Sequence, residues 1–168
     1  MDPKSALHFT LLNVSESADD VRALIYDNLY EPWGVTREKN WLNSEDGGAF
    51  LVARDGEGTL LGVARIMPID AVSTEHKTPP ECAGERMLRQ VVVAVDARGK
   101  GIGRALMAQA EAIARSEGAT RVGLGSRCQA YGFYQACGYE FYGEEYMSLL
   151  TRIPHTHMSK ILSPPEHS

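Results

Sequence analysis

Three glycines and several cations are crowded into one short stretch of the sequence, DARGKGIGRAL, from Asp96 to Leu106. The apolar run VVVAV precedes this stretch, and an Ala-rich sequence with helical character follows it. Where a strand leads directly into a helix, the first N–H groups of the helix have no acceptor within it and carry the positive end of its dipole. The stretch is therefore a candidate anion site.

The glycines at 99, 101 and 103 suit such a site because they accept unusual dihedrals and carry no Cβ that would obstruct a phosphate. Arg98, Lys100 and Arg104 add positive charge near the same backbone. The simpler interpretation is a glycine turn that joins a strand to a helix, with solvated cations. We expect a phosphate ligand.

Two familiar phosphate-binding motifs do not fit this stretch. A P-loop needs G-x-x-x-x-G-K-[ST], whereas Lys100 lies between two glycines and no hydroxyl residue follows it. The dinucleotide fingerprint needs a third glycine three residues after the second, where Leu106 stands after Gly103. Nucleoside triphosphates and nicotinamide cofactors are therefore disfavoured.

The segment from Arg98 to Gly103 resembles the R/Q-x-x-G-x-G/A signature of the GCN5-related N-acetyltransferase (GNAT) superfamily, whose loop holds the pyrophosphate of acetyl-coenzyme A. Further downstream, AYGFYQACGY from Ala130 to Tyr139 is similar to the family segment A-x-x-F-Y-x-x-x-G-F/Y. Two motifs in this order and at this separation are a specific signal. The resemblance covers most of the chain and is strongest from Val91 to Tyr139.

This resemblance implies direct transfer of an acetyl group from acetyl-coenzyme A to a primary amine, without a metal. In the family, the strand before the loop parts from its neighbour and offers backbone N–H groups, here those of Val93 and Val95, to the thioester. Donors held in place stabilise the developing oxyanion. The loop residues implied in coenzyme binding are Arg98, Gly99, Lys100, Gly101, Ile102, Gly103 and Arg104.

Tyr134 aligns with the tyrosine that many family members use as the general acid toward the coenzyme A thiolate. A phenol has an ordinary pKa near ~10, so it is protonated at neutral pH and able to donate. The alternative is an aromatic side chain that packs beside Phe133 in a helix.

The general base is open, because the strand before the loop carries Arg89 and Gln90 where many family members place a carboxylate. We expect Glu85, at the start of that strand, or His155 to take this role. His155 lies in IPHTHM, which is reminiscent of the ElaA-like branch, and an imidazole with a pKa near ~6.5 suits a base. Two further candidates, for which a solvated surface role is the simpler interpretation, are Glu144 and Glu145.

Arg127 stands where many family members have an asparagine that reaches the coenzyme. It could meet a phosphate or a substrate carboxylate, and so could Arg89. The cysteines Cys82, Cys128 and Cys137 have no CxxC spacing, which favours reduced thiols over zinc or a disulfide. An acyl-cysteine intermediate is disfavoured because no histidine stands in an obvious pairing position.

Two other functions remain open from the residues. A module that binds coenzyme A as a sensor or scaffold would keep the loop but lose turnover, and the missing strand carboxylate is compatible with it. A binder of nucleotide phosphates would prefer coenzyme A no more than ATP. We expect the acceptor to be a small-molecule or peptide amine, and the resemblance is compatible with a homodimer.

The chain has 168 residues, 43% of them hydrophobic, and a net charge of -5. This composition favours one globular domain over residues 1–168, with short flexible ends near 1–5 and 163–168. The acidic balance argues against a nucleic-acid partner, and neither a signal peptide nor a membrane span is evident, so we expect a cytoplasmic protein.

Hydrophobic periodicity predicts a mixed α/β order with a strand–helix–strand unit in the second half. The resemblance implies a single GNAT-like α/β (α+β) domain, whose mostly antiparallel sheet has about six or seven strands and about four flanking helices. We expect strands at 7–14, 86–95 and 120–126, a hairpin within 48–68, and one or two strands in 139–162. We expect helices beginning near 17, 36, 103 and 129, and an irregular stretch at 68–84.

Overall fold

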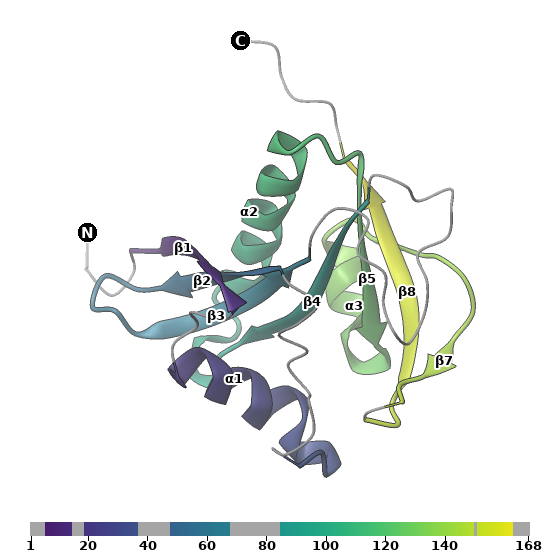
Figure 1. Ribbon diagram of the computed structural model, residues 1–168, viewed down its shortest axis with the longest axis horizontal. Helices are drawn as coiled ribbons and strands as arrows, with labels where there is room; N and C mark the ends of the chain where they lie inside the picture. Colours follow the sequence, from purple (N-terminus) through teal and green to yellow (C-terminus); the bar gives the residue numbers. More distant parts are fainter. Residues whose placement is uncertain (1–5, 15–18, 37–47, 68–84, 150, 163–168) are drawn as a thin grey trace.

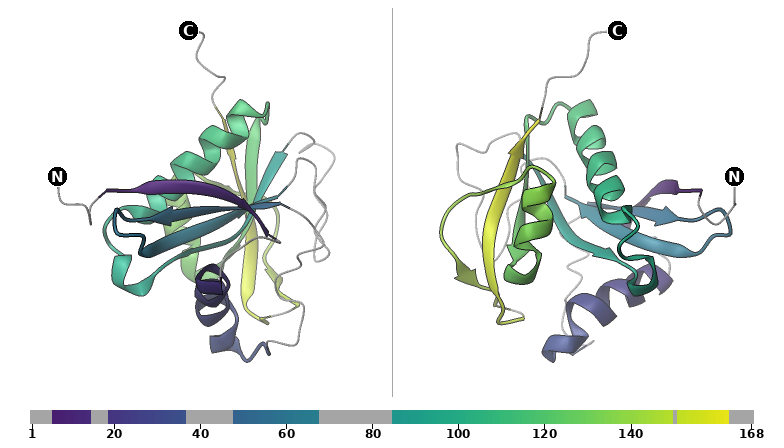
Figure 2. Two further views of the ribbon diagram at one scale, coloured as in Figure 1. Left: turned by 60° about the vertical axis from the view of Figure 1, so that its left-hand side comes forward. Right: turned by 180° about the vertical axis from the view of Figure 1, so that it is seen from behind.

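The structure is a computed structural model, and it describes residues 6–14, 19–36, 48–67, 85–149 and 151–162. In these residues one eight-stranded sheet carries helices on both of its faces (Figures 1 and 2). The strand order is β1-β2-β3-β4-β5-β8-β6, and β7 also pairs with β8. β4 and β5 run parallel, whereas the other described pairs are antiparallel. The expected mixed, mostly antiparallel α/β fold is confirmed.

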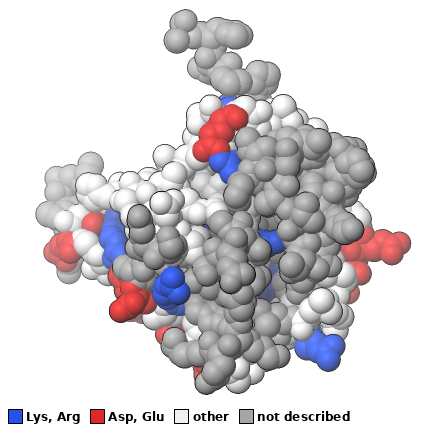
Figure 3. Space-filling model, viewed as in Figure 1, with Lys and Arg blue, Asp and Glu red and all other residues white. Residues whose placement is uncertain are grey.

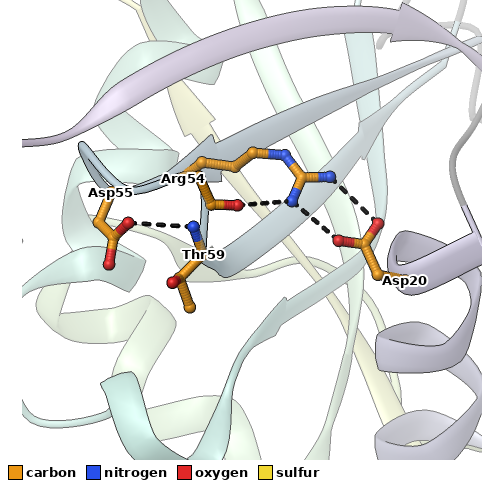
Figure 4. A network of polar contacts seen from close by, with 5 residues as sticks. Asp20, Arg54, Asp55 and Thr59 are labelled. Carbon is orange, nitrogen blue, oxygen red and sulfur yellow. Dashed lines mark hydrogen bonds and ion pairs between the residues drawn. The ribbon is translucent and has the colours of Figure 1, made fainter.

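The first part of the sheet is formed by β1 (His8–Asn13), β2 (Ala49–Arg54) and β3 (Leu60–Ile66). β2 and β3 form the predicted hairpin. The Asp55 carboxylate closes the turn by accepting the N–H groups of Glu57 at 2.8 Å and Thr59 at 3.0 Å, and the second of these bonds is drawn in Figure 4. Gly58 has a φ of 86°, which glycine adopts without strain.

Helix α1 (Asp19–Leu29) covers one face of the sheet. Its apolar spacing buries Val21 and Ile25 in a cluster with Phe50 and Val63. At its start, Asp20 forms an ion pair with Arg54 of β2 at 2.8 Å (Figure 4). A short 3-10 turn, η3 (Glu31–Trp33), follows and ends at Gly34, which has a φ of 75°.

Helix α2 (Ile102–Ser116) lies on the opposite face from α1, as the left view of Figure 2 shows. It follows β4 (Glu85–Val93) and the 3-10 turn η6 (Val95–Ala97). Its small and apolar positions, Leu106 and Ala110 among them, pack in a cluster with Leu51 and Leu88 of the sheet. The Ala-rich helix expected near residue 103 is therefore present.

The second part of the sheet contains β5 (Arg121–Arg127), η7 (Cys128–Ala130), α3 (Tyr131–Ala136) and β8 (Pro154–Ile161). Two additional strands, β6 (Glu140–Phe141) and β7 (Tyr146–Met147), pair with β8. The segment 139–162 thus has three strands where one or two were expected. Two-residue strands are too short to show the alternation on which sequence interpretation depends.

The buried carboxylate of Glu111 is part of a network that connects α2, α3 and β8. Glu111 of α2 accepts the Tyr139 hydroxyl at 3.0 Å and the Lys160 ammonium of β8 at 2.8 Å. Lys160 also donates to the Cys137 carbonyl at the end of α3, at 3.0 Å. These contacts fix α3 against α2 and β8.

Several expectations lie outside the described residues: nearly all of the helix expected over 36–42, the irregular stretch 68–84, and the two chain ends. Among the helices that are described, none is long and apolar enough to cross a bilayer.

Candidate active site between the parting strands

The two parallel strands pair over only half of their length. Their register runs from Glu85 opposite Arg121 to Leu88 opposite Leu124. Beyond that point β4 continues to Val93 and β5 to Arg127, and the described parts of the two strands no longer pair with each other. Figure 1 shows β4 turning away from β5 toward the first part of the sheet.

A bulge in β4 accompanies this divergence. Val63 of β3 faces Val92, whereas Arg65 faces Arg89, so three steps along β4 match two along β3. Gln90 lies within the bulge and has a φ of 52°. A bulge bends its strand and increases the local twist, which directs the end of β4 away from β5. The sequence has no turn residue here, so sequence analysis missed this feature.

Beyond Leu88 and Leu124 the diverging strands β4 and β5 leave a gap between them. The backbone of β4 beyond the bulge presents polar groups toward this gap. Ala94 donates its N–H to Leu61 of β3 at 2.8 Å. Because successive residues of a strand direct their N–H and C=O groups to opposite edges, those of Val93 point away from β3. Val95 begins η6, and its carbonyl accepts the N–H of Arg98 at 3.3 Å. The N–H of Val93, one of the two donors expected at the thioester, therefore faces the gap, and the role expected for the N–H of Val95 stays a prediction.

The glycine loop has the conformation that its residues suggest. Gly99 and Gly101 have φ values of 78° and 82°, and a Cβ at either position would meet nothing within 4 Å. Gly101 is the N-cap of α2 and provides no side-chain cap. At this end of the helix, the Ala105 N–H donates to the Gly101 carbonyl at 3.0 Å. The backbone N–H groups of residues 102–104 thus form the positive end of α2.

Gly103 serves another purpose, which is close packing. A Cβ there would lie 3.0 Å from the ring of Phe133 and 3.6 Å from Val93. The first turn of α2 therefore contacts both α3 and the end of β4. The glycine loop, the end of β4 and the segment 130–139 therefore lie next to one another.

The cations of the loop differ in their environments. Arg98 folds back, because its Nε donates to the Val93 carbonyl at 3.1 Å and its Nη2 to the Asn28 side chain of α1 at 3.2 Å. Lys100 and Arg104 are exposed beside the start of α2. Lys100 and Arg104 thus place positive charge at the surface beside the loop, whereas Arg98 holds the loop against β4 and α1.

Tyr134 is a buried residue of α3, with an exposed fraction of 8%. Its ring packs edge-on against Phe133, with centroids 5.1 Å apart, and against Tyr139 at 5.9 Å. Burial raises the pKa of Tyr134 well above its usual range, and the nearby Arg127 cation opposes this shift. The phenol is therefore protonated at neutral pH, as a general acid requires.

The candidate bases lie in different places. Glu85 is the first residue of β4, opposite Arg121, in the paired half of the two strands and ~25 Å of strand away from Val93. His155 of β8 faces Arg127 across the register at the open end of β5. Glu144 and Glu145 are exposed beside β7.

His155 also has a defined tautomer. Its Nδ1 lies 2.8 Å from the Ile153 carbonyl, which can only accept a hydrogen bond. Nδ1 therefore carries the hydrogen, and Nε2 is the basic nitrogen of the neutral ring. The ring of Tyr146 packs against this imidazole, with centroids 5.7 Å apart.

The two described cysteines flank α3 and are half-buried. Burial raises the pKa of the Cys137 thiol, which disfavours the thiolate that covalent catalysis would need. Among the described residues, no three His, Cys, Asp or Glu side chains are grouped in a way that could hold a metal ion.

Comparison with known proteins agrees with this architecture. The acetyltransferase (GNAT) family matches residues 18–139, and the chain belongs to this family. It is similar to N-acetyltransferase family 8 member 2 of Rattus norvegicus, with 30% identity over 118 residues, which are 68% of this chain and 48% of that protein. The chain thus spans about half of the length of this relative.

Solved structures of low sequence identity share the fold. Escherichia coli ElaA has a TM-score of 0.62 at 19% identity, with coverage of 92% of this chain and 99% of that chain. A Bacillus subtilis acetyltransferase in complex with CoA has a TM-score of 0.62 at 18% identity, with coverage of 93% and 100%. At these identities the likeness concerns the fold, so membership of the ElaA-like branch stays a prediction.

Proposed function

We propose that this protein transfers an acetyl group from acetyl-coenzyme A to a primary amine. The observation that carries the proposal is the parting of β4 and β5 beyond Leu88 and Leu124, with the positive end of α2 at the end of β4. The gap offers a path for a thioester arm, and the start of α2 offers a place for its pyrophosphate. The Bacillus subtilis relative of this fold binds CoA, which supports the same ligand class here.

In this proposal the coenzyme uses mainly backbone. The pyrophosphate contacts the N–H groups of residues 102–104, next to Gly99 and Gly101, and the side chains of Lys100 and Arg104 add charge. The pantetheine arm enters the gap, where the Val93 N–H donates to the thioester carbonyl. A preorganised donor of this kind is worth about 3–4 kcal/mol of barrier in other enzymes.

The neutral amine attacks the thioester carbon, forms a C–N bond and produces a tetrahedral intermediate whose oxyanion accepts the Val93 N–H. The C–S bond then breaks, and the sulfur receives a proton from the Tyr134 hydroxyl. The amine nitrogen loses a proton to Nε2 of His155. The products are the amide and coenzyme A, and solvent returns the protons to their starting positions.

We propose His155 rather than Glu85 as the base. His155 is opposite Arg127 at the open end of the strands, and its Nδ1 contact leaves the basic nitrogen at Nε2. Glu85 belongs to the part of β4 that pairs with β5. An amine at the end of the thioester arm would meet His155 first.

The test is release of coenzyme A from acetyl-coenzyme A with a panel of amines, for the wild-type protein and for Tyr134→Phe. The matched control is Tyr131→Phe, also in α3, whose hydroxyl lies 2.6 Å from that of Thr156. We expect amine-dependent release that falls about 100-fold or more in Tyr134→Phe but stays near wild type in Tyr131→Phe. Tight binding of coenzyme A without release for any amine would instead favour a sensor or scaffold.

A further inference from the structure

Three arginines occupy neighbouring strands on the face of the sheet that carries α1. Arg65 of β3 faces Arg89 of β4 across the register, and Arg127 ends β5. Val63, two residues before Arg65, packs with α1, so Arg65 points to the same face. Arg65 is fully buried, with an exposed fraction of 0%. In Figure 3 some basic side chains are visible near the centre of the molecular face, and other basic and acidic ones are scattered around it.

These cations converge around Tyr30, at the end of α1. Gln90 in the bulge donates from its amide to the Tyr30 hydroxyl at 3.0 Å. Burial raises the pKa of Tyr30, and the positive charges of Arg127, Arg89 and Arg65 all oppose that shift. The chain as a whole has a net charge of -5, so this concentration of positive charge is local.

Arg127 is the member of this group best placed to receive a ligand. Its contacts in the described part of the chain are with neutral groups, namely the Leu29 carbonyl and the ring of Trp33, whose centroid lies 4.5 Å from the guanidinium carbon. Burial lowers the pKa of Arg127, so its charge is poorly solvated. A guanidinium has five N–H donors and matches a carboxylate in a bidentate manner.

Arg127 also lies close to the proposed chemistry. Its charge acts on the phenol of Tyr134, and His155 faces it across the register. The pyrophosphate loop, in contrast, leads into α2 on the other face of the sheet. An anion at Arg127 would thus belong to the acceptor and would lie within a short distance of the reacting amine.

We propose that the acceptor is an amino acid, with its amine and a free carboxylate in one small molecule, and that Arg127 binds the carboxylate. This inference rests on the proposed acetyl transfer and names the class of acceptor for that site. Arg65 and Arg89, which have interactions of their own, contribute a positive field, and Trp33 holds the guanidinium in place.

The first experiment uses the wild-type protein and matched acceptors that differ only in the carboxylate. For each of a panel of amino acids we would compare the free acid, its C-terminal amide and the decarboxylated amine, for example L-phenylalanine, L-phenylalaninamide and 2-phenylethylamine. We expect kcat/KM to be about tenfold or more higher for the best free acid than for its amide. The amine of the amide loses its proton more readily and so has the larger neutral fraction, which by itself would favour the amide and cannot explain a preference for the free acid.

Variants then connect the preference to Arg127. Arg127→Gln should raise KM for the free acid about ten- to a hundredfold and leave KM for acetyl-coenzyme A and for the amide nearly unchanged. Arg127→Lys, which keeps the charge, should recover part of the preference. Arg121→Gln, at the other end of the same strand, is the matched control and should behave like wild type. Thermal unfolding of each variant identifies any that does not fold.

The outcomes separate the two proposals. Equal turnover of acids, amides and amines would overturn the carboxylate site and leave acetyl transfer intact. A parallel rise in KM for acetyl-coenzyme A in Arg127→Gln would assign Arg127 to the coenzyme. If no acceptor is turned over, acetyl transfer itself fails, and calorimetry with N-acetyl-L-phenylalanine and its amide still tests the carboxylate site. Equal affinity for these two compounds in the wild-type protein would then overturn it.

Discussion

The ring of Phe133 lies against Gly103, 3.0 Å from where a Cβ on that glycine would be. This contact joins the first turn of α2, which we assign to the coenzyme pyrophosphate, to the helix that carries Tyr134. Phe133 is the neighbour of Tyr134 in sequence, and their rings also touch edge-on. The proposed phosphate site and the proposed general acid are thus in contact through Phe133, which packs where Gly103 has no Cβ.

Substituting Gly103 tests this connection. In Gly103→Ala the added Cβ must displace Phe133 and shift Tyr134 with it, so we expect kcat to fall about tenfold or more, since small misplacements of catalytic groups are costly. Gly132→Ala in α3, where a Cβ meets nothing within 4 Å, is the matched control. Steady-state thiol release measures both. Wild-type kcat in Gly103→Ala would show that the contact does not position Tyr134.

Removing the exposed cations of the loop tests the pyrophosphate assignment. For the double variant Lys100→Gln/Arg104→Gln we expect KM for acetyl-coenzyme A to rise about tenfold, through loss of charge-assisted contacts. KM for S-acetylpantetheine, which has no pyrophosphate, should not change. Arg115→Gln, in the last turn of the same helix, serves as control. Equal changes in KM for both donors would show that Lys100 and Arg104 do not act through the pyrophosphate.

Buried tyrosines predict a loss of stability at alkaline pH. Burial raises the pKa of Tyr134 and of Tyr139 in the folded state above the unfolded value of about 10. The unfolded state therefore releases these protons first, so their contribution is fully present below about pH 10 and is lost as the pH rises through and beyond it. The loss is up to about 1.4 kcal/mol per pH unit for each tyrosine.

Denaturant unfolding between neutral and alkaline pH measures this loss. Tyr134→Phe should lose less stability with rising pH than wild type, because one of the buried titrating groups is gone. An ultraviolet titration of tyrosinate in the folded protein provides the independent check. A variant with the same pH slope as wild type would show that Tyr134 ionises normally.

The buried ion pair between Glu111 and Lys160 should contribute more to the free energy of unfolding than the exposed pair between Asp20 and Arg54. Glu111→Gln or Lys160→Met breaks a pair in which the carboxylate side chain is only 8% exposed, and we expect each to lower the free energy of unfolding by about 1–3 kcal/mol. The double variant should cost less than the sum, because neither charge is left alone. Asp20→Asn, which breaks the exposed pair with Arg54, should cost about 0–1 kcal/mol. Denaturant unfolding of the four variants decides between additivity and coupling.

Local residue patterns were enough to predict much of this fold. The hairpin follows from two apolar runs around Asp55 and Gly58, and α2 follows from an apolar stripe after a glycine loop. The positive φ of Gly99 and Gly101 agrees with the use we expected for these glycines. The sequence does not predict β6 and β7 as separate strands, because an element of two residues is too short to show hydrophobic alternation.

The candidate site is divided in the same way between sequence and tertiary structure. The sequence by itself determined the glycine loop and the tyrosine-bearing segment, because each depends on residues that are neighbours along the chain. Only the tertiary structure decided where β4 leaves β5, since the bulge at Gln90 depends on register with β3. It also brought Arg65, Arg89 and Arg127 together, because three strands far apart in sequence present these side chains to one face, and no local pattern records that proximity.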